Sequence, residues 1–282
     1  MTPLGRVAIL GTGQIGTMVG MALRSAPGPG VEEVVAWDRD PAAREACLRR
    51  AGADRLLHGP EEALESDLII LATPVAQIVG FVLELGPRLR SRQVLVDTGS
   101  SKLEVVRAMQ RCVPEGAGAI GGHPLCGGSE PGPWSADPAL LKGATFVLCR
   151  VRDDPLSLGT ARQLVEMLGS TVLELDASEH DRLLARSSHL PHLVAAAVAE
   201  MSGAVPTPAL FSSGLRGAVR LARSDPAMVA SFVCANLEEV RAATRELSLH
   251  LDRLLAAAAS GEECLVPELE AARLRARQVG VG

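Results

Sequence analysis

Aromatic residues are scarce in this sequence. It has no tyrosine, two tryptophans and four phenylalanines among 282 residues, so any hydrophobic core has to be built from aliphatic side chains. Basic charge is not concentrated either, because 28 Lys and Arg are outweighed by 33 Asp and Glu, a net charge of −5. Nucleic acid and anionic membranes are therefore not expected as partners. An acidic ligand would have to be bound by a few local arginines.

Signals for export or membrane insertion are also missing. The six cysteines are scattered and none forms a C-x-x-C pair, which predicts reduced thiols. An apolar run begins within a few residues of the first methionine, leaving no room for a signal peptide. The longest apolar stretch, residues 193–210, is interrupted by an acid, a glycine and two prolines, which excludes a membrane span. We therefore expect a cytoplasmic protein.

The stretch from residue 7 to residue 38 is the most informative. An apolar run, a glycine turn, a helical segment and a second apolar run follow one another there, in the order of a dinucleotide-binding βαβ unit. Gly11 would permit the tight bend, Gly13 a close approach of the backbone to a pyrophosphate, and Gly16 close packing of helix on strand. We predict cofactor contacts from the whole turn: Gly11, Thr12, Gly13, Gln14, Ile15 and Gly16.

The acid that closes the second apolar run predicts which dinucleotide is bound. Asp38 lies at about the separation from the turn expected for a carboxylate that accepts hydrogen bonds from the adenosine ribose. The same carboxylate would repel the 2′-phosphate of NADP, so NAD is the predicted cofactor. Arg39, the next residue, leaves NADP as the alternative.

Polar residues recur where later apolar runs end. Thr73 follows the run 68–72, Ser100 follows 94–97, and His123 lies in a Gly- and Pro-rich segment after a predicted short strand, 117–120. If these runs are parallel strands, their carboxyl ends meet at the ligand-binding edge of the sheet. Thr73 is then either a cofactor contact or a simple strand terminator. The segment after residue 120 is either a functional loop or a surface turn, and its position favours function.

The sequence pattern changes near Asp176. Apolar runs alternate with amphipathic segments before it, and only helical patterns follow, beginning at Ser178 as a predicted N-cap. We expect an α/β fold with an N-terminal Rossmann-type dinucleotide-binding domain over residues 1–176. An all-α helical substrate and dimerisation domain would cover residues 177–282. Because helices this apolar would struggle to bury their own faces, we expect a homodimer.

Removing a hydride from a carbinol carbon requires a base for the hydroxyl proton, and a neutral histidine suits that role. His123, beside Ser100 and the predicted nicotinamide, is the candidate base; the alternative is a solvated histidine. His189 and His192 have a spacing that suits a metal, but without a third ligand no metal is expected, and either could be packed in the core. Arg220 is the candidate for binding a carboxylate bidentately. The arginines at 216 and 223 would then be surface charges.

Together these motifs resemble one enzyme family. Behind the glycine turn the chain carries, in this order, Asp97-x-Gly99-Ser100-x-Lys102, Gly122-His123-Pro124, Ser188-His189-Leu190-Pro191-His192 and Arg220-x-Ala222-x-Ser224-Asp225-Pro226. This combination is similar to the prephenate/arogenate dehydrogenase family of tyrosine biosynthesis. The resemblance extends from Val7 to about Asn236, and the tail from Leu237 matches only as helix.

The resemblance implies NAD-dependent oxidative decarboxylation of a small cyclohexadienyl carboxylate, namely prephenate to 4-hydroxyphenylpyruvate. Ring C4 gives up a hydride, the C4 hydroxyl loses its proton, and the ring carboxylate leaves as CO₂. In the family the histidine of the HP motif is the base, which implies that role for His123. By the same correspondence Ser100 orients this histidine and the nicotinamide, and His189 and Arg220 contact the substrate.

The chain departs from the family pattern at several places. The family often has an acid after the glycine and threonine of the HP loop, whereas here Gly128 and Ser129 occupy those places and Glu130 is displaced by one. Gly217, Val219 and Val229 replace an acid, a threonine and an aromatic residue. These positions lie near the substrate in the family. Arogenate and 4-amino-4-deoxyprephenate therefore stay open as alternative substrates.

Two rival functions share the predicted fold: another reductase with a Rossmann domain and helices, such as a β-hydroxyacid dehydrogenase or an imine reductase, and a non-enzymatic protein. A β-hydroxyacid dehydrogenase needs a catalytic lysine at the start of its helical domain, and no lysine occurs between Asp176 and Gly282. That argues against this class. The non-enzymatic rival is a dinucleotide-binding sensor that has lost the chemistry. It would bind the cofactor without producing NADH from any cyclohexadienyl acid.

Overall fold

The structure, a computed structural model, describes residues 4–26, 30–128, 130–203, 207, 209 and 211–279. Their contacts divide the chain into two compact units, Met1–Asn236 and Leu237–Gly282. All strands found in the described residues belong to the larger unit. The predicted combination of a Rossmann-type sheet and a following helical region is confirmed.

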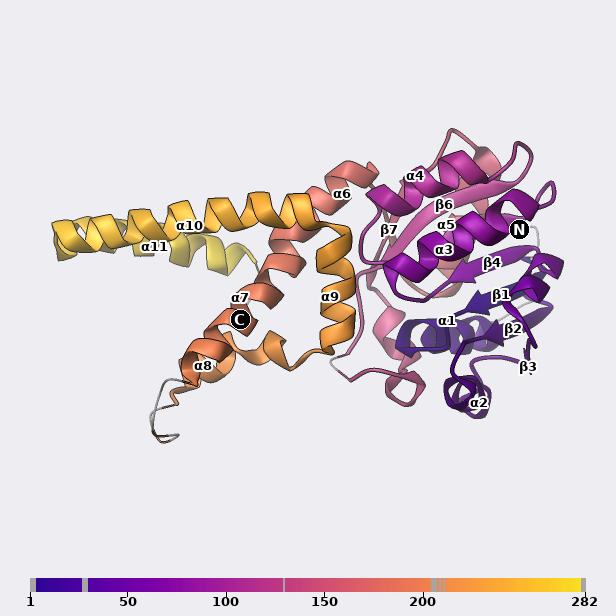
Figure 1. Ribbon diagram of the computed structural model, residues 1–282, viewed down its shortest axis with the longest axis horizontal. Helices are drawn as coiled ribbons and strands as arrows, with labels where there is room; N and C mark the ends of the chain where they lie inside the picture. The colour runs from indigo at the N-terminus through magenta and orange to yellow at the C-terminus, as the bar shows by residue number, and fades with distance from the viewer. Residues whose placement is uncertain are drawn as a thin grey trace. The chain divides into compact units, whose positions relative to one another are not determined.

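An eight-stranded sheet forms the centre of the larger unit (Figure 1). The strands lie in the order β3-β2-β1-β4-β5-β6-β7-β8. β7 is antiparallel to β6, and the other neighbouring strands are parallel. The strands are β1 (Arg6–Leu10), β2 (Glu33–Trp37), β3 (Arg55–Leu56), β4 (Leu68–Leu71), β5 (Val94–Asp97), β6 (Gly118–Pro124), β7 (Thr145–Arg150) and β8 (Thr171–Glu174).

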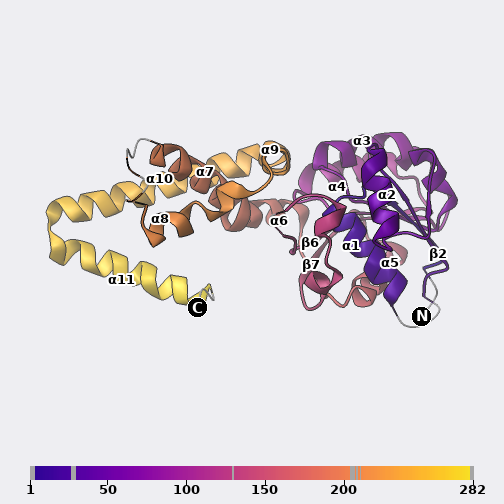
Figure 2. The same ribbon diagram turned by 90° about the horizontal axis from the view of Figure 1, so that it is seen from below.

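Helices cover both faces of this sheet (Figure 2). Ala8 and Leu10 of β1 belong to a core that includes residues of α3 and α4, whereas Val7 and Ile9 belong to a second core with residues of α1 and α5. Because both faces of the sheet are covered, the central strands β1, β4 and β5 are almost entirely apolar. The helices around the sheet are α1 (Gln14–Ser25), α2 (Pro41–Arg49), α3 (Val75–Leu85), α4 (Leu103–Cys112) and α5 (Pro155–Met167).

The chain reverses the direction of strand addition at β1. β2 and β3 lie on one side of β1, and β4 and the later strands lie on the other. In open parallel sheets such a switch point forms a crevice beyond the carboxyl ends of the strands, where ligands bind. The glycine turn follows β1 at this point.

Strand β6 differs from the prediction. The sequence predicted a strand over 117–120 followed by a loop, but β6 continues to Pro124, so His123 lies in a strand. The antiparallel neighbour β7 explains the extension, because Gly122 pairs with Leu148 and His123 with Val147. A Cβ atom at Gly122 would overlap the carbonyl oxygen of Asp97. Glycine therefore serves close strand packing here and does not mark a turn.

The first helix after the sheet begins earlier than predicted. α6 spans Ala177–Leu184, and Asp176, not Ser178, is its N-cap. The Asp176 carboxylate accepts a hydrogen bond of 2.8 Å from the backbone N–H of Ser178. The prediction of Ser178 as N-cap was wrong because an acid two residues earlier competes for the same free N–H groups.

Further helices complete the larger unit. A π-helical turn (Ala185–His189), α7 (Leu190–Ser202), α8 (Ser213–Ala218), a 3₁₀ turn (Arg220–Arg223) and α9 (Pro226–Ala235) follow α6. α9 packs on α3, and α6 packs on α4. The division of the chain at residue 176 stays a prediction: the strands end before it, whereas the compact unit continues to Asn236.

The smaller unit consists of α10 (Leu237–Ser260) and α11 (Glu262–Gln278). The two helices turn at Gly261, whose φ of 123° suits glycine, and an ion pair of 3.1 Å joins Arg253 to Glu268. Several of its leucines are half or more exposed: Leu249, Leu251, Leu255, Leu269 and Leu274.

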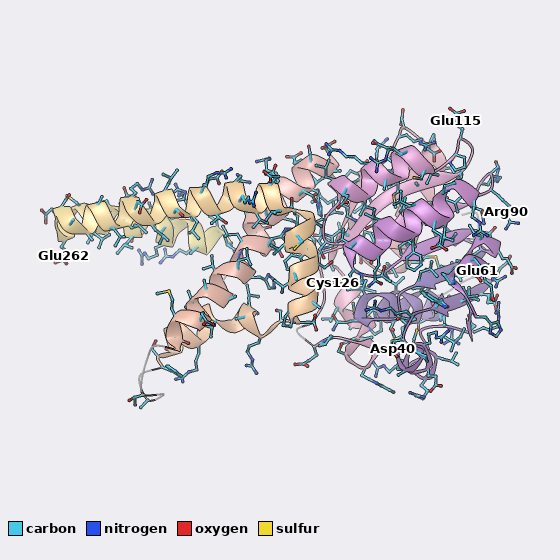
Figure 3. The ribbon with its side chains drawn as sticks, in the orientation of Figure 1. Asp40, Glu61, Arg90, Glu115, Cys126 and Glu262 are labelled. Carbon is cyan, nitrogen blue, oxygen red and sulfur yellow. The ribbon has the colours of Figure 1, made fainter. Side chains whose placement is uncertain are left out.

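Charged side chains such as Glu61, Arg90 and Glu115 lie at the surface of the larger unit (Figure 3). All six cysteines are unpaired thiols. Among the described helices, none combines the length and the apolar character needed to cross a bilayer.

Candidate functional site

The glycine turn has the geometry that the sequence predicted. Gly11 has a φ of 105°, and a side chain there would collide with the backbone of Ala72. A Cβ at Gly16 would overlap the carbonyl oxygen of Gly11. Glycine at these two positions therefore allows α1 to start directly against the end of β1.

A cavity of about 330 Å³ lies beside this turn. Gly13, Gln14 and Ile15 line it together with Thr73 and Ser100, whereas Gly11, Thr12 and Gly16 lie outside its lining. The site fits a phosphate-bearing ligand on three counts. A Cβ at Gly13 would meet open space, Gly13 caps α1 without a side-chain hydrogen bond, and helix N-termini of this kind bind anions. The buried hydroxyls of Thr12 and Thr73 also have no hydrogen-bond partner in the described part of the chain.

Asp38 is held against the turn by the backbone. Its carboxylate accepts one hydrogen bond of 2.7 Å from the N–H of Thr12 and another of 3.0 Å from the N–H of Asp40. Asp38 lines neither cavity of this region. Its contact with a ribose stays a prediction, and its position at the end of β2 is the one that the motif requires.

A second cavity, of about 510 Å³, brings the remaining candidates together. Ser100, His123, His192 and Arg220 line it, although they come from four separate segments of the chain. The two cavities share part of their walls, including Gln14, Ser100 and Phe232. The space next to the glycine turn is therefore adjacent to the space that His123 faces.

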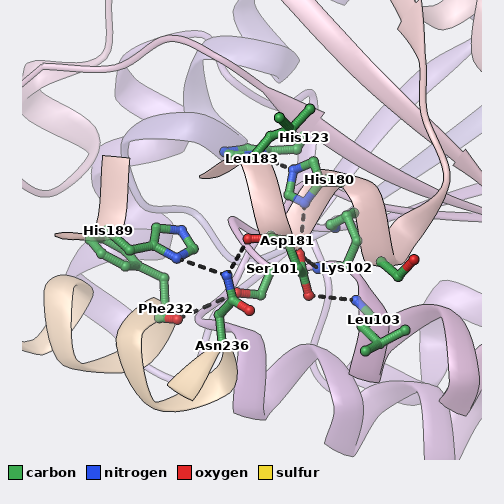
Figure 4. Close-up of polar contacts among 12 residues, drawn as sticks. Ser101, Lys102, Leu103, His123, His180, Asp181, Leu183, His189, Phe232 and Asn236 are labelled. Atoms are coloured by element: carbon green, nitrogen blue, oxygen red, sulfur yellow. Dashed lines mark hydrogen bonds and ion pairs between the residues drawn. The ribbon is translucent and has the colours of Figure 1, made fainter. Parts of the chain in front are cut away.

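The hydrogen-bond partner of His123 is a residue that the sequence analysis did not identify. Nδ1 of His123 lies 2.9 Å from Nε2 of His180, and Nδ1 of His180 lies 2.7 Å from Oδ1 of Asp181 (Figure 4). The resemblance assigned the orientation of His123 to Ser100, which lines the same cavity; that role stays a prediction, and the structure adds the contact with His180. His180 and Asp181 were interpreted only as part of a helix start. A His-Asp pair on the buried side of that helix was the available signal.

Both histidines of this pair are neutral at physiological pH. Burial lowers the pKa of His123 well below its usual range, and the nearby His180 and Lys102 lower it further. Burial also lowers the pKa of His180, although the hydrogen bond to Asp181 opposes that shift. A neutral imidazole is the form that can accept a proton.

The acid and lysine of the Asp97 to Lys102 motif hold the strands beside His123. Lys102 is fully buried, forms an ion pair with the buried Asp97, and donates a hydrogen bond of 2.7 Å to the carbonyl oxygen of Gly122. Asp97 also accepts hydrogen bonds from the N–H groups of Gly99 and Gly122, at 2.7 and 3.1 Å. These contacts fix the end of β5 to β6 next to His123.

His189 is buried and does not line the second cavity, whereas His192 does. The Asn236 amide nitrogen donates to the carbonyl oxygen of Asp181, at 2.7 Å, and lies 3.1 Å from Nδ1 of His189. Nδ1 of His189 is therefore an acceptor, and Nε2 carries the proton of the neutral ring. This Nε2 is buried, and a backbone hydrogen bond with Ser100 acts on the ring. Burial lowers the pKa of His189 to about 4, and the ring stacks on Phe232 with 4.6 Å between centroids.

Arg220 lies in the 3₁₀ turn after α8 and lines the second cavity. No ion pair joins it to another described residue. Arg216 and Arg223 are exposed and line neither of the two cavities. Of the three neighbouring arginines, Arg220 is the one in position to bind an anion inside the cavity.

Gln14 links the glycine turn to the segment after β6. Its side-chain oxygen accepts a hydrogen bond of 2.9 Å from the N–H of Gly128, and its nitrogen donates to the hydroxyl of Ser135 at 3.0 Å. Glu130 lines the first cavity, and Ser129, one of the departures from the family pattern, lies outside the described residues.

Comparisons with known proteins match this architecture. Residues 19–174 match the family model "Prephenate dehydrogenase, nucleotide-binding domain", and residues 176–268 match "Prephenate dehydrogenase, dimerization domain". The prephenate dehydrogenase of Lactococcus lactis is 28% identical over 256 residues, which cover 88% of this chain and 70% of that protein. The cyclohexadienyl dehydrogenase of Zymomonas mobilis is 28% identical over 84% of this chain and 82% of its own length.

A solved structure shares the fold over nearly the whole chain. The prephenate dehydrogenase of Aquifex aeolicus, crystallised in complex with hydroxyphenyl propionate and NAD+, superposes with a TM-score of 0.88. The alignment covers 98% of each chain at 24% identity. At this level of identity the likeness concerns the fold.

Proposed function

The chain belongs to the prephenate dehydrogenase family, and we propose that it is an NAD-dependent enzyme that oxidatively decarboxylates prephenate to 4-hydroxyphenylpyruvate. One observation carries this proposal. His123, a neutral histidine, and Arg220, which has no ion pair with another described residue, line one cavity that shares part of its wall with the cavity at the glycine turn. A base, an anion-binding group and a dinucleotide turn are the parts that this reaction needs.

Residues of the glycine turn and of two strand ends would hold the cofactor. The N–H groups at the start of α1 suit the diphosphate, Asp38 suits the adenosine ribose, and Thr73 and Ser100 line the cavity at the ends of β4 and β5. When bound, NAD+ supplies the acceptor for the hydride that leaves ring C4. Because a carboxylate at position 38 disfavours a 2′-phosphate, NAD is preferred over NADP.

His123 takes the role of general base. Its Nδ1 is bonded to His180, so Nε2 is the nitrogen available to a ligand in the cavity. It accepts the proton of the C4 hydroxyl while the hydride leaves C4. Loss of the ring carboxylate as CO₂ returns an electron pair to the ring, which becomes aromatic. Ser100 would position the hydroxyl and the nicotinamide side by side.

Arg220 would contact the substrate from the wall of the second cavity, and the family resemblance assigns a further substrate contact to the buried His189. The guanidinium of Arg220 pairs with a carboxylate of the substrate, for which its planar fork is suited. His189 is buried outside the lining of this cavity, and a backbone hydrogen bond with Ser100 acts on its ring, so its contact with the substrate rests on the resemblance alone. His192 lines the same cavity as Arg220.

We assign different functions to the two predicted domains. Residues 1–176 would bind the dinucleotide, and residues 177–282 would complete the substrate site and form a homodimer in the cytoplasm. The match of residues 176–268 to a dimerization-domain model and the exposed leucines of α10 and α11 support the dimer.

An absorbance assay at the NADH band tests the function. Purified protein is supplied with prephenate, arogenate or 4-amino-4-deoxyprephenate, each with NAD+ or NADP+, and the aromatic products are identified by mass. We expect the highest kcat/KM with prephenate and NAD+. A preference for arogenate or the amino analogue would reassign the substrate. Cofactor binding without reduction on any of the three would favour a dinucleotide sensor.

A further inference from the structure

We propose that His180 is a positioning residue that fixes the tautomer of His123 and carries the influence of Asp181 to it. This inference rests on the proposed function for its catalytic meaning. The structural part rests on the contacts alone. His180 lies between the two other groups, bonded to His123 through Nε2 and to Asp181 through Nδ1 (Figure 4).

The donor and acceptor of each hydrogen bond can be assigned by starting from Asp181. An ionised carboxylate only accepts hydrogen bonds, so Nδ1 of His180 is the donor to Asp181. A neutral imidazole has one N–H and one lone pair, and Nε2 of His180 is therefore the acceptor. His123 must then donate from Nδ1, which leaves the lone pair on its Nε2. The tautomer that results is the one a base facing the cavity needs.

Asp181 is itself held in place by the backbone. Its carboxylate accepts hydrogen bonds from the N–H groups of Lys102 and Leu103, at 2.7 and 2.9 Å, where α4 begins. His180 is fully buried, so neither of its bonds competes with water. His180 and Asp181 are therefore held rigidly, and a rigid hydrogen-bond partner can fix one tautomer of His123.

The same contacts act during proton transfer. When Nε2 of His123 accepts the hydroxyl proton, the ring becomes an imidazolium with N–H groups at both nitrogens. Its Nδ1–H stays bonded to His180, and the negative charge of Asp181 compensates the new positive charge through that ring. No further group is oxidised or reduced, and after CO₂ has left, Nε2 returns the proton to the oxygen on C4, which completes the phenol of the product. Aspartate plays an equivalent role toward histidine in Ser-His-Asp hydrolases.

Two conservative substitutions separate the two hydrogen bonds. In His180→Asn the amide nitrogen can still donate to Asp181, but the side chain ends before the position of Nε2. In His180→Gln the amide oxygen can reach that position and accept from Nδ1 of His123. If His180 served only in packing, His180→Gln would not keep the tautomer of His123 better than His180→Asn does. His58→Gln, which changes an exposed histidine, is the control.

The primary measurement is ¹⁵N NMR of histidine-labelled full-length protein without ligands, with the His123 signals assigned from their loss in His123→Asn. We expect the Nδ1–H tautomer in wild type, His180→Gln and His58→Gln, and a mainly Nε2–H ring in His180→Asn. An Nε2–H ring in wild type would overturn the proposal, and so would an unchanged Nδ1–H ring in His180→Asn.

Kinetics give the second measurement. We expect His180→Asn to lower kcat roughly 100-fold with little change in KM, and His180→Gln to recover most of that loss. Equal losses in the two variants would overturn the role in turnover. The NMR measurement uses no substrate, so it tests the tautomer of His123 even if the proposed reaction is wrong. An error in the proposed reaction would instead be seen in the NADH assay.

Discussion

The carboxylate of Asp38 accepts a hydrogen bond of 2.7 Å from the backbone N–H of Thr12. The acid that is predicted to select NAD therefore also closes the glycine turn. A substitution that removes both side-chain oxygens changes both properties, whereas a substitution that keeps one neutral oxygen changes only the charge.

Asp38→Asn separates these properties because the amide oxygen can still accept from Thr12. We expect discrimination against NADP to fall about 10-fold, since hydrogen bonds to a charged group contribute roughly 1.5 to 3 kcal/mol. Steady-state kcat/KM with each cofactor measures this ratio. Asp38→Ala should in addition lower the free energy of unfolding by about 1 to 3 kcal/mol, because the N–H of Thr12 loses its partner. A wild type that already prefers NADP would contradict the assignment.

Replacing the proposed base should abolish turnover without affecting the cofactor. His123→Asn is expected to lower kcat by roughly 10² to 10⁴, whereas the Kd for NAD+ changes little because His123 does not line the cavity at the glycine turn. Initial rates measure the change in kcat, and calorimetric titration with NAD+ measures the Kd. Near-normal turnover in this variant would remove His123 from the role of base.

Arg220→Ala should weaken substrate binding selectively. Loss of a charged hydrogen bond to a carboxylate is expected to raise KM about 10- to 100-fold, with an unchanged Kd for NAD+. Arg223→Ala is the matched control, because Arg223 lies in the same 3₁₀ turn and lines neither of the two cavities. If both variants keep the KM of wild type, Arg220 is a surface charge.

The buried histidines make stability depend on pH. Folding lowers the pKa values of His123, His180 and His189, the last to about 4. Between that value and the ordinary histidine pKa of about 6.5 the unfolded chain binds more protons than the folded one. Stability should therefore be greatest above pH 6.5 and fall as the pH drops, by about 3 kcal/mol from His189 alone.

Urea unfolding between pH 4 and 8 measures this decline. His189→Gln should flatten part of it, whereas His250→Gln, an exposed residue on α10, should leave it unchanged. A wild-type protein that was equally stable at pH 5 and pH 7 would show that these rings are not buried as neutral groups.

The leucines of the smaller unit should hold the dimer together. Leu251 and Leu255 are one helical turn apart on α10 and are 51% and 69% exposed in the single chain. Burying two charges at a subunit interface is unfavourable, so the double variant Leu251→Glu, Leu255→Glu is expected to shift the protein toward the monomer. Light scattering after size-exclusion chromatography measures this. Leu83→Glu, at an exposed site on α3, should keep the wild-type mass.

The sequence determined the local parts of this protein. The glycine turn between β1 and α1 depends on neighbouring residues and on steric exclusion at Gly11 and Gly16, so its pattern is visible in the chain itself. The apolar runs in the sequence predicted the central strands, because a strand that is buried on both faces is apolar along its whole length. The motif around His123 was likewise recognisable because its residues are close together in sequence.

Only the tertiary structure decided how separate segments meet. The extension of β6 through His123 depends on pairing with β7, which no local pattern reports. His180 became the partner of His123 because α6 packs beside α4 and β7, and the structure places His192, not His189, in the wall of the second cavity. Hydrogen bonds between distant residues depend on packing directions, and packing directions are a property of the whole fold.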